Sequence, residues 1–238
     1  MKKNVLIGCS SYNNRFWKGI FYPENLPASK WFDYYCKHFD TYEMNGTFYK
    51  FPTLKVMQNW YKKVPEDFVF AVKAPKEITH IKKFIDCEAL LSDFYRVCKE
   101  GLQEKLGPIL FQFPPSYTFT AERLQIIVKS VNTSFNNVIE FRHSSWWNKE
   151  VWTTLKENNI TFCSVSYPGL PEDILTEFPL LYIRLHGNRK LFYSRYSPEE
   201  LEILQKQTLN KTGYIYFNNT ASEAGILNAL ELNAITND

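Results

Sequence analysis

The stretch Leu181-Tyr-Ile-Arg-Leu-His-Gly187 begins as a short apolar run and then carries Arg184 and His186, side chains that an ordinary buried strand lacks. The same arrangement recurs in Val138-Ile-Glu-Phe-Arg-His143, where an acid and an arginine follow two apolar residues. Near-continuous apolar runs are typical of parallel strands that are buried on both faces. Polar residues just after such runs lie at the carboxyl ends of the strands, where α/β folds build their functional sites.

Eight runs of this kind occur along the chain and alternate with segments of helical spacing. Such alternation indicates parallel strands joined by right-handed crossovers. Eight units in 238 residues fit a (β/α)8 barrel of the TIM type, which typically takes about 250 residues. We therefore expect an α/β fold with a single TIM-type barrel domain over residues 1–238. The expected strands are 5–8, 41–43, 68–72, 109–111, 138–139, 160–163, 181–183 and 214–217.

The helix that should follow the sixth strand is missing from the pattern. Residues 167–179 contain three prolines and predict a loop or a single turn, so the sixth βα unit is expected to be irregular. The last helix is predicted over 221–233. Residues with good N-cap side chains begin five other predicted helices: Ser29, Thr53, Thr120, Asn148 and Ser197.

Composition predicts an ordinary globular protein. The hydrophobic share is 45%, and the net charge of +3 is too small to imply a nucleic-acid partner by itself. The five cysteines are widely spaced and form no C-x-x-C pair, which indicates buried thiols in a reducing compartment. No apolar stretch reaches the roughly 20 residues of a membrane helix. We expect a cytoplasmic protein that does not enter a membrane, and the sequence does not indicate its oligomeric state.

If the strands close in order, their polar ends share one basin. The carboxylates there, Glu43 and Glu140, are candidate catalytic groups together with His186, because carboxylates and imidazoles move protons near neutral pH. Each residue alone could also belong to a structural network, so the prediction depends on the joint pattern. The candidate ligand-binding side chains at the strand ends are Asn45, Lys73, Gln112, Arg142, His143, Arg184, Asn218 and Asn219.

Charge in this basin indicates an anionic ligand. Lys73, Arg142 and Arg184 outnumber the two carboxylates, and arginine forks suit phosphate oxygens. No H-x-H, H-E-x-x-H or aspartate-rich spacing is present, so no residue is predicted as a metal ligand and the cofactor stays undetermined.

Aromatic residues are frequent in the predicted loops, where they serve either as packing or as stacking surfaces for bases and sugars. The segment 189–196 mixes three cations with three aromatics, and its Tyr193 and Tyr196 are candidate ligand contacts. Phe48 and Trp146 are expected to be core. The full set of loop aromatics is Tyr12, Phe16, Trp17, Phe48, Tyr49, Trp146, Trp147, Tyr193 and Tyr196.

The sequence resembles the YecE-like family, a bacterial and archaeal group known as a domain of unknown function. The resemblance implies a TIM-type barrel and says little about activity, although nucleic-acid processing has been suggested for the family by similarity to phosphodiester-cleaving barrels. The motifs that carry it run nearly end to end: Ile7-Gly-Cys-Ser-Ser-Tyr12, His38-Phe-Asp-Thr-Tyr-Glu-Met-Asn45, Phe70-Ala-Val-Lys73, Gln112-Phe-Pro-Pro115, Glu140-Phe-Arg-His143, Tyr182-Ile-Arg-Leu-His-Gly187 and Tyr216-Phe-Asn-Asn219.

Two positions depart from the family pattern. Ser166 stands where members usually carry Asp after the sixth strand, and Thr220 stands where they usually read Asn-Asn-Asp after the eighth. Both changes remove a carboxylate and leave the predicted basin more cationic.

The leading hypothesis is a barrel that binds a phosphate-bearing ligand, DNA or RNA above all, and hydrolyses a phosphodiester. Lys73, Arg142 and Arg184 would hold phosphate, and Glu140 or Glu43 would handle water with His186. A second hypothesis is a glycoside hydrolase that uses Glu43 and Glu140 as its carboxylate pair. A third is a non-catalytic nucleic-acid or protein-binding module, because a fold does not fix a function.

Overall fold

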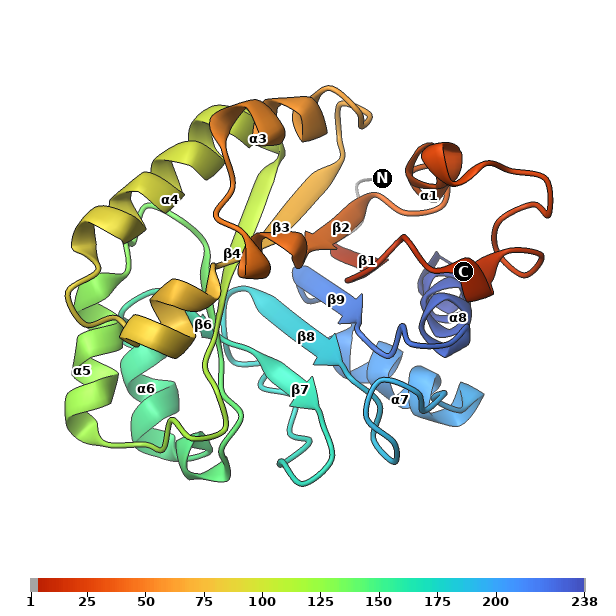
Figure 1. Cartoon of the computed structure of the whole chain (residues 1–238). Coiled ribbons are helices and arrows are strands. Elements are labelled where there is room, and N and C mark those ends of the chain that lie inside the picture. Colours follow the sequence, from red (N-terminus) through yellow and green to blue (C-terminus); the bar gives the residue numbers. More distant parts are fainter. Residues whose placement is uncertain (1–3, 238) are drawn as a thin grey trace. The chain divides into compact units, whose positions relative to one another are not determined.

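The computed structural model describes residues 4–237. The chain divides into two compact units, residues 1–43 with 164–238 and residues 44–163, which we call unit 1 and unit 2. Both are α/β units with parallel strands (Figure 1). The α/β class with parallel strands is therefore confirmed.

Unit 1 is built on a four-stranded sheet of order β1–β9–β8–β7. Helices α7 and α8 lie on one side of β8 and β9 (Figure 1). Every residue of β8 is buried, as expected for a parallel strand covered on both faces. The elements are β1 (Val5–Cys9), the 3₁₀ turns Arg15–Trp17 and Ala28–Lys30, α1 (Trp31–Tyr35), β2 (Thr41–Met44, which runs into unit 2), β7 (Ser164–Ser166), β8 (Leu181–Leu185), α7 (Pro198–Thr208), β9 (Gly213–Phe217) and α8 (Ala224–Asn237).

Gly213 sets the close approach of β9 to β8. A Cβ at this position would lie 2.1 Å from the carbonyl oxygen of Leu181, its partner in the register. Only a residue without a side chain fits here. The glycine therefore allows β9 to pair with β8 in this register.

Unit 2 carries the second parallel sheet, of order β2–β3–β4–β5–β6. Helices α3, α4, α5 and α6 lie along the outer side of its strands (Figure 1). The elements are α2 (Gly46–Tyr49), α3 (Leu54–Tyr61), β3 (Val69–Lys73), the π-helical turn Glu77–Lys82, α4 (Glu88–Leu102), the 3₁₀ turn Gln103–Lys105, β4 (Leu106–Gln112), α5 (Ala121–Ser130), β5 (Asn137–Glu140), the 3₁₀ turn Ser144–Trp146, α6 (Lys149–Glu157) and β6 (Ile160–Phe162).

The division of the strands into two sheets leaves the predicted barrel unconfirmed. The hydrogen-bonded strand order divides the strands between them and does not close a ring, so the TIM-type barrel stays a prediction. The expected strand over 160–163 is found as β6, and the residues directly after it form a further strand, β7, which belongs to the other sheet. Cys163 lies between them, and its backbone N–H donates to the carbonyl of Ile139 at 2.8 Å. The irregular sixth unit is confirmed, since the described chain has no helix between β7 and β8.

Four of the five predicted N-caps are confirmed. The side chains of Thr53, Thr120, Asn148 and Ser197 each accept a backbone N–H in the first turn of their helix. The prediction for Ser29 is wrong, because this residue lies inside the 3₁₀ turn Ala28–Lys30 and α1 starts at Trp31. The last helix begins at Ala224, three residues later than predicted.

Each unit has an aromatic core under its own sheet. In unit 1, Tyr35 is fully buried, and its hydroxyl accepts the backbone N–H of Cys9 at 2.8 Å and donates to the carbonyl of Thr41 at 3.0 Å.

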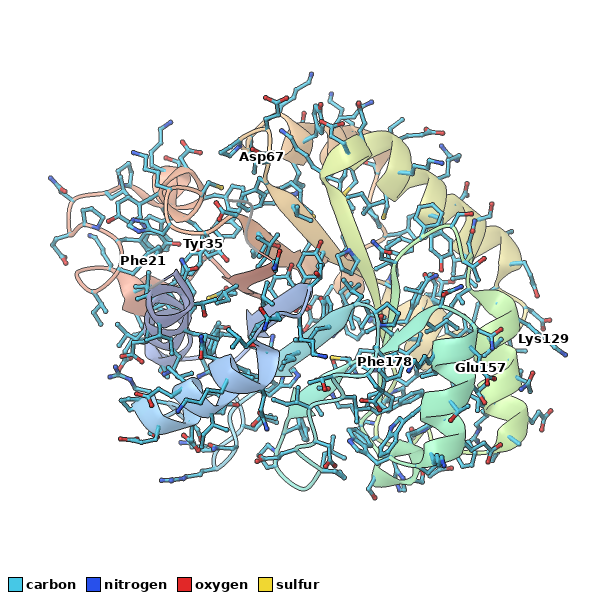
Figure 2. All side chains as sticks on the ribbon, turned by 180° about the vertical axis from the view of Figure 1, so that it is seen from behind. Phe21, Tyr35, Asp67, Lys129, Glu157 and Phe178 are labelled. Carbon is cyan, nitrogen blue, oxygen red and sulfur yellow. The ribbon has the colours of Figure 1, made fainter. Side chains whose placement is uncertain are left out.

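Lys129 and Glu157 mark the solvent-facing sides of α5 and α6 in unit 2 (Figure 2). The amphipathic pattern of these helices is therefore explained by one buried and one exposed face.

Candidate functional site

Polar side chains gather at the carboxyl ends of the strands in both units, as the sequence predicts. We describe one group in each unit. The Glu43 network of unit 1 consists of Ser10, Glu43, Tyr182, Arg184, His186 and Asn218, and the Lys73 cluster of unit 2 consists of Phe48, Lys73, His80, Gln112, Glu140 and Arg142.

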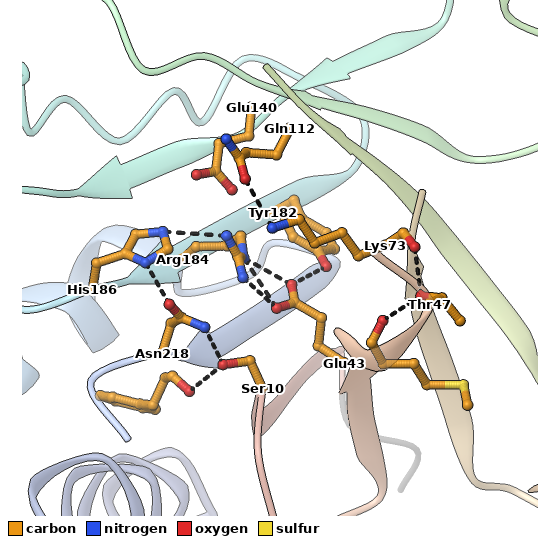
Figure 3. Close-up of polar contacts among 12 residues, drawn as sticks. Ser10, Glu43, Thr47, Lys73, Gln112, Glu140, Tyr182, Arg184, His186 and Asn218 are labelled. Carbon is orange, nitrogen blue, oxygen red and sulfur yellow. Dashed lines mark hydrogen bonds and ion pairs between the residues drawn. The ribbon is translucent and has the colours of Figure 1, made fainter. Parts of the chain in front are cut away.

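The centre of the Glu43 network is a buried ion pair. Arg184 Nη2 lies 2.6 Å from Glu43 Oε1, and Arg184 Nε lies 2.9 Å from Oε2 (Figure 3). The Tyr182 hydroxyl donates to Oε2 at 2.6 Å, so both carboxylate oxygens accept hydrogen bonds. All three side chains are at most 1% exposed. Such a pair is costly to desolvate and costly to break, so it fixes the local geometry.

The two ring nitrogens of His186 have different hydrogen-bond partners, which fit the tautomer with the proton on Nδ1. Arg184 Nη1 lies 3.3 Å from His186 Nε2, and a guanidinium only donates, so Nε2 must accept. The proton is then on Nδ1, which donates to Asn218 Oδ1 at 2.7 Å. Both ring nitrogens of His186 are therefore engaged within the network.

Asn218 and Asn219 extend the network in different directions. The Asn218 amide donates to the Ser10 hydroxyl, which donates to the carbonyl of Phe217 at 3.3 Å. The Asn219 amide donates to the carbonyl of Ser194 at 2.8 Å and holds the loop after β8. Ser10, buried at the end of β1, is a network member that the sequence analysis did not include.

In the Lys73 cluster the ammonium group is held by its neighbours. Lys73 Nζ donates to Gln112 Oε1 at 2.8 Å, a contact between the ends of the adjacent strands β3 and β4 (Figure 3). The same Nζ lies 4.2 Å from the centre of the Phe48 ring. The Gln112 amide donates to the carbonyl of Phe113 at 2.8 Å, which fixes the orientation of the acceptor. These contacts hold the ammonium group in place.

Arg142 and Glu140 form an ion pair at the end of β5, between Arg142 Nε and Glu140 Oε1. Glu140 is fully buried, whereas the Arg142 side chain is 9% exposed. The guanidinium is therefore the less buried member of the pair.

His80 is the functional candidate that the sequence analysis missed. It lies in the π-helical turn Glu77–Lys82, 4.9 Å from the Phe48 ring, and its Nδ1 lies 2.9 Å from the Thr79 hydroxyl. Burial, followed by the charges of Lys73, Arg142 and Lys83, lowers the pKa of His80 to about 4, against an opposing effect of Glu140. Its position in a turn, away from any strand end, gave no signal in the sequence.

Asn45 and His143 follow their strands as predicted, and each lies at the start of a short turn. Asn45 precedes the first residue of α2. His143 Nδ1 accepts the backbone N–H of Ser145 at 3.2 Å and caps the turn Ser144–Trp146. The side chain of His143 therefore stabilises this turn.

The two tyrosines of the 189–196 loop differ in exposure. Tyr193 is 51% exposed, and Lys190 Nζ lies 4.6 Å from its ring centre. Tyr196 is buried, its hydroxyl accepts the backbone N–H of Gly187 at 2.9 Å, and burial raises its pKa to about 12. Only Tyr193 presents a ring to solvent.

The other loop aromatics divide between core and surface. Trp146 is buried as predicted, whereas the prediction that Phe48 is core is wrong, because the ring is half-buried beside the cation of Lys73. Trp17 is also buried; Phe16 and Tyr49 are exposed; and Tyr12 and Trp147 are half-buried.

The family model described as "Protein of unknown function DUF72" matches residues 6–238. The chain belongs to this family. It is 24% identical to the UPF0759 protein YunF of Bacillus subtilis over 237 residues, 84% of each chain. It is 29% identical to the UPF0759 protein YecE of Escherichia coli K12 over 118 residues, 48% of this chain and 42% of the relative. The predicted membership of the YecE-like group is confirmed.

Solved structures of DUF72 proteins share the fold. A Thermotoga maritima member superposes with a TM-score of 0.88 at 29% identity and covers 98% of this chain and 99% of its own. A member from Enterococcus faecalis gives a TM-score of 0.82 at 21% identity, with 98% and 96% covered.

Ser166 and Thr220, the two positions where the resemblance implies that a carboxylate is missing, lie in unit 1. The Ser166 hydroxyl donates to the carboxylate of Glu172 at 3.4 Å. Thr220 accepts the side-chain amide of Asn14 through its backbone carbonyl at 2.6 Å, a contact that does not depend on its side chain.

The described chain, residues 4–237, contains no group of three His, Cys, Asp or Glu side chains arranged to hold a metal ion. Within the same residues, no helix combines the length and the apolar character needed to span a membrane.

Proposed function

We propose that this DUF72 protein binds a phosphate-bearing ligand, nucleic acid above all, through the Lys73 cluster. The observation that supports this most strongly is the positive field at His80. Burial is the largest cause of the lowered pKa of His80, and the charges of Lys73, Arg142 and Lys83 add to it, against the opposing charge of Glu140. A half-buried site with this excess of nearby positive charge is suited to an anion, because the anion offsets the repulsion among the cations.

Each member of the cluster has a role in this proposal. Lys73 supplies a point charge whose place is fixed by Gln112 and Phe48. Arg142 supplies a planar fork that matches phosphate oxygens. His80, neutral at pH 7, can accept or donate a hydrogen bond at the same ligand.

Nucleic acid is favoured over free phosphate by the exposed aromatic surface nearby. Tyr49 is 76% exposed, and its ring centre lies 5.1 Å from that of Phe48, which itself contacts Lys73. A cation with an exposed aromatic ring beside it is the combination that stacks a base while holding its phosphate.

The proposal extends to phosphodiester hydrolysis, with Glu140 orienting the attacking water. Glu43 and His186 are assigned a structural role within unit 1, because their polar atoms are engaged with Arg184, Tyr182 and Asn218. The same contacts weigh against the glycoside hydrolase, which requires the Glu43 carboxylate to face a sugar. A non-catalytic binding module remains the alternative if Glu140 proves dispensable.

Binding is tested by fluorescence anisotropy with labelled single-stranded RNA and DNA of about 12 nucleotides. Lys73→Gln and Arg142→Gln should each weaken binding by about tenfold, and the affinity should fall as salt rises. Lys129→Gln, on the outer face of α5, is the matched control and should bind as the unchanged protein does. Absence of binding at low salt, or equal binding by all four proteins, would contradict the proposal.

Hydrolysis is tested separately with the same oligonucleotides and gel analysis of products. Glu140→Gln should abolish cleavage while it retains binding. Cleavage that survives this change excludes Glu140 as the catalytic carboxylate, and binding without any cleavage supports the non-catalytic module.

We further propose that the two parallel sheets belong to one closed barrel and one domain over residues 1–238. The alternation of strands and helices along the chain supports this. The five free thiols fit a reducing compartment, and we propose the cytoplasm as the location. A crystal structure and fractionation of cells test these two points.

A further inference from the structure

We propose that unit 1 holds a second binding site, on the face of β7 and β8 opposite Arg184, for a small organic cation with an apolar body. This site is independent of the Lys73 cluster and of the function proposed for it. Its basis is the missing crossover helix between β7 and β8.

The register of the two strands defines which side chains share this face. Ser164 pairs with Ile183, and Ser166 pairs with Leu185, in a parallel ladder. Residues two apart along a strand point to the same side, so these four side chains share one face and Arg184 lies on the other. The Glu43 network and the proposed site are therefore on opposite faces of the sheet.

A parallel sheet is normally covered by helices on both faces. Here α7 covers part of this face, but the connection 167–180 contributes no helix in the described structure. Leu175 and Phe178 pack as buried residues from that connection. A cavity of about 240 Å³ is bounded by β7, β8, α7 and the connection between the two strands.

The inner wall of this cavity is apolar. Ile174 from the connection, Ile183 and Leu185 from β8, and Leu201 and Leu204 from α7 line it. At about 30 Å³ per water-sized volume, the space suits a ligand of roughly eight non-hydrogen atoms. Burial of such an apolar body against these side chains supplies the binding free energy.

The charged side chains at the cavity are acidic. Glu172 and Glu200 line it, and its described lining includes no lysine, arginine or histidine. Glu200 is engaged in the capping box of α7 and accepts the Asn188 amide at 2.7 Å. Glu172 is exposed and accepts a weak 3.4 Å hydrogen bond from Ser166. Glu172 is thus the carboxylate placed to meet an ammonium group at the mouth.

The proposed ligand therefore has a protonated amine and an aliphatic or aromatic body. The amine lies at Glu172, and the body lies against Ile183, Leu185 and Leu204. A carboxylate in place of the amine would be repelled by the two glutamates, so the site should discriminate by charge rather than by size.

The test uses hexylammonium chloride as the probe, with sodium hexanoate as its charge-reversed match. Titration followed by ¹H–¹⁵N NMR should give a dissociation constant on the order of 1 mM for hexylammonium, with shifts at Ile174, Ile183, Leu185 and Leu204. Hexanoate should bind at least about tenfold more weakly. Glu172→Gln should weaken hexylammonium binding about fivefold.

Glu177→Gln is the matched control, since this exposed carboxylate lies in the same connection and outside the cavity lining. It should leave the affinity unchanged. Ile174→Trp, which fills the cavity from the connection, should abolish binding while the remaining spectrum stays folded. Equal affinity for the two probes, shifts outside the cavity, or no binding of hexylammonium would overturn the proposal.

Discussion

At the scale of single residues, the two ion pairs at the strand ends share a fully buried glutamate and differ in their arginine, since Arg184 is 1% exposed and Arg142 is 9% exposed. In the sequence, the pair Glu43 and Arg184 could not be distinguished from the pair Glu140 and Arg142, because all four residues lie at strand ends. The sequence predicted that polar groups gather there. It could not predict which acid pairs with which base, because that depends on side-chain packing between strands far apart in the chain.

The Glu43–Arg184 pair should be costly to break. Arg184→Met leaves a buried carboxylate without its counter-charge and should lower the free energy of unfolding by about 3–5 kcal/mol. Arg195→Met removes an exposed pair with Glu231 in the same unit and should cost less than about 1 kcal/mol. Urea unfolding measures both, and similar losses for the two variants would show that the buried pair is not a stabilising contact.

His80 should make stability depend on pH. Its folded pKa of about 4 lies below the usual 6.5, so the unfolded chain binds more protons between these values. The contribution is complete above pH 6.5 and is lost as pH falls toward 4. Because the ring is half exposed and screened by solvent, we expect a loss on the order of 1 kcal/mol.

The control for this prediction is His80→Gln, which has no titrating group at this position. Urea unfolding of both proteins between pH 7 and pH 4.5 should show a steeper loss for the unchanged protein. Parallel pH profiles would contradict the lowered pKa of His80.

At the scale of elements, capping residues and apolar periodicity predicted most helices because both act locally. Thr53, Thr120, Asn148 and Ser197 begin their helices as predicted. The change from one sheet to the other at Cys163 was not predictable. The apolar and small residues on both sides of Cys163 contain no proline, glycine or charge that would indicate the end of a strand. His80 was missed for a related reason, because a π-helical turn has no sequence signature.

The packing of α3 on α4 depends on a glycine. A Cβ at Gly101 in α4 would lie 2.2 Å from Met57 Cβ in α3, and Met57 is fully buried. Gly101→Ala should therefore lower the free energy of unfolding by roughly 1–3 kcal/mol, although alanine favours a helix. Gly46→Ala in α2 meets no atom within 4 Å and is the matched control. Thermal unfolding checks both, and a stable Gly101→Ala protein would show that the helices can separate without cost.

At the scale of the whole molecule, the alternating pattern predicted an α/β fold with parallel strands, and this is confirmed. The pattern did not reveal that the strands divide between two sheets and the chain between two units. Local periodicity reports whether a strand is buried, but it does not report which sheet the strand joins. The family assignment agrees with the motifs, and the function rests on the chemistry of the clusters.

The most direct test of the proposed function is the pKa of His80, measured by NMR with and without a saturating single-stranded oligonucleotide. His80→Gln identifies the resonance. Phosphodiesters stay ionised at pH 4, so a phosphate held by Lys73 and Arg142 should raise the pKa from about 4 by about one unit or more. A pKa that stays near 4 while the oligonucleotide is bound would place the ligand elsewhere and contradict the account.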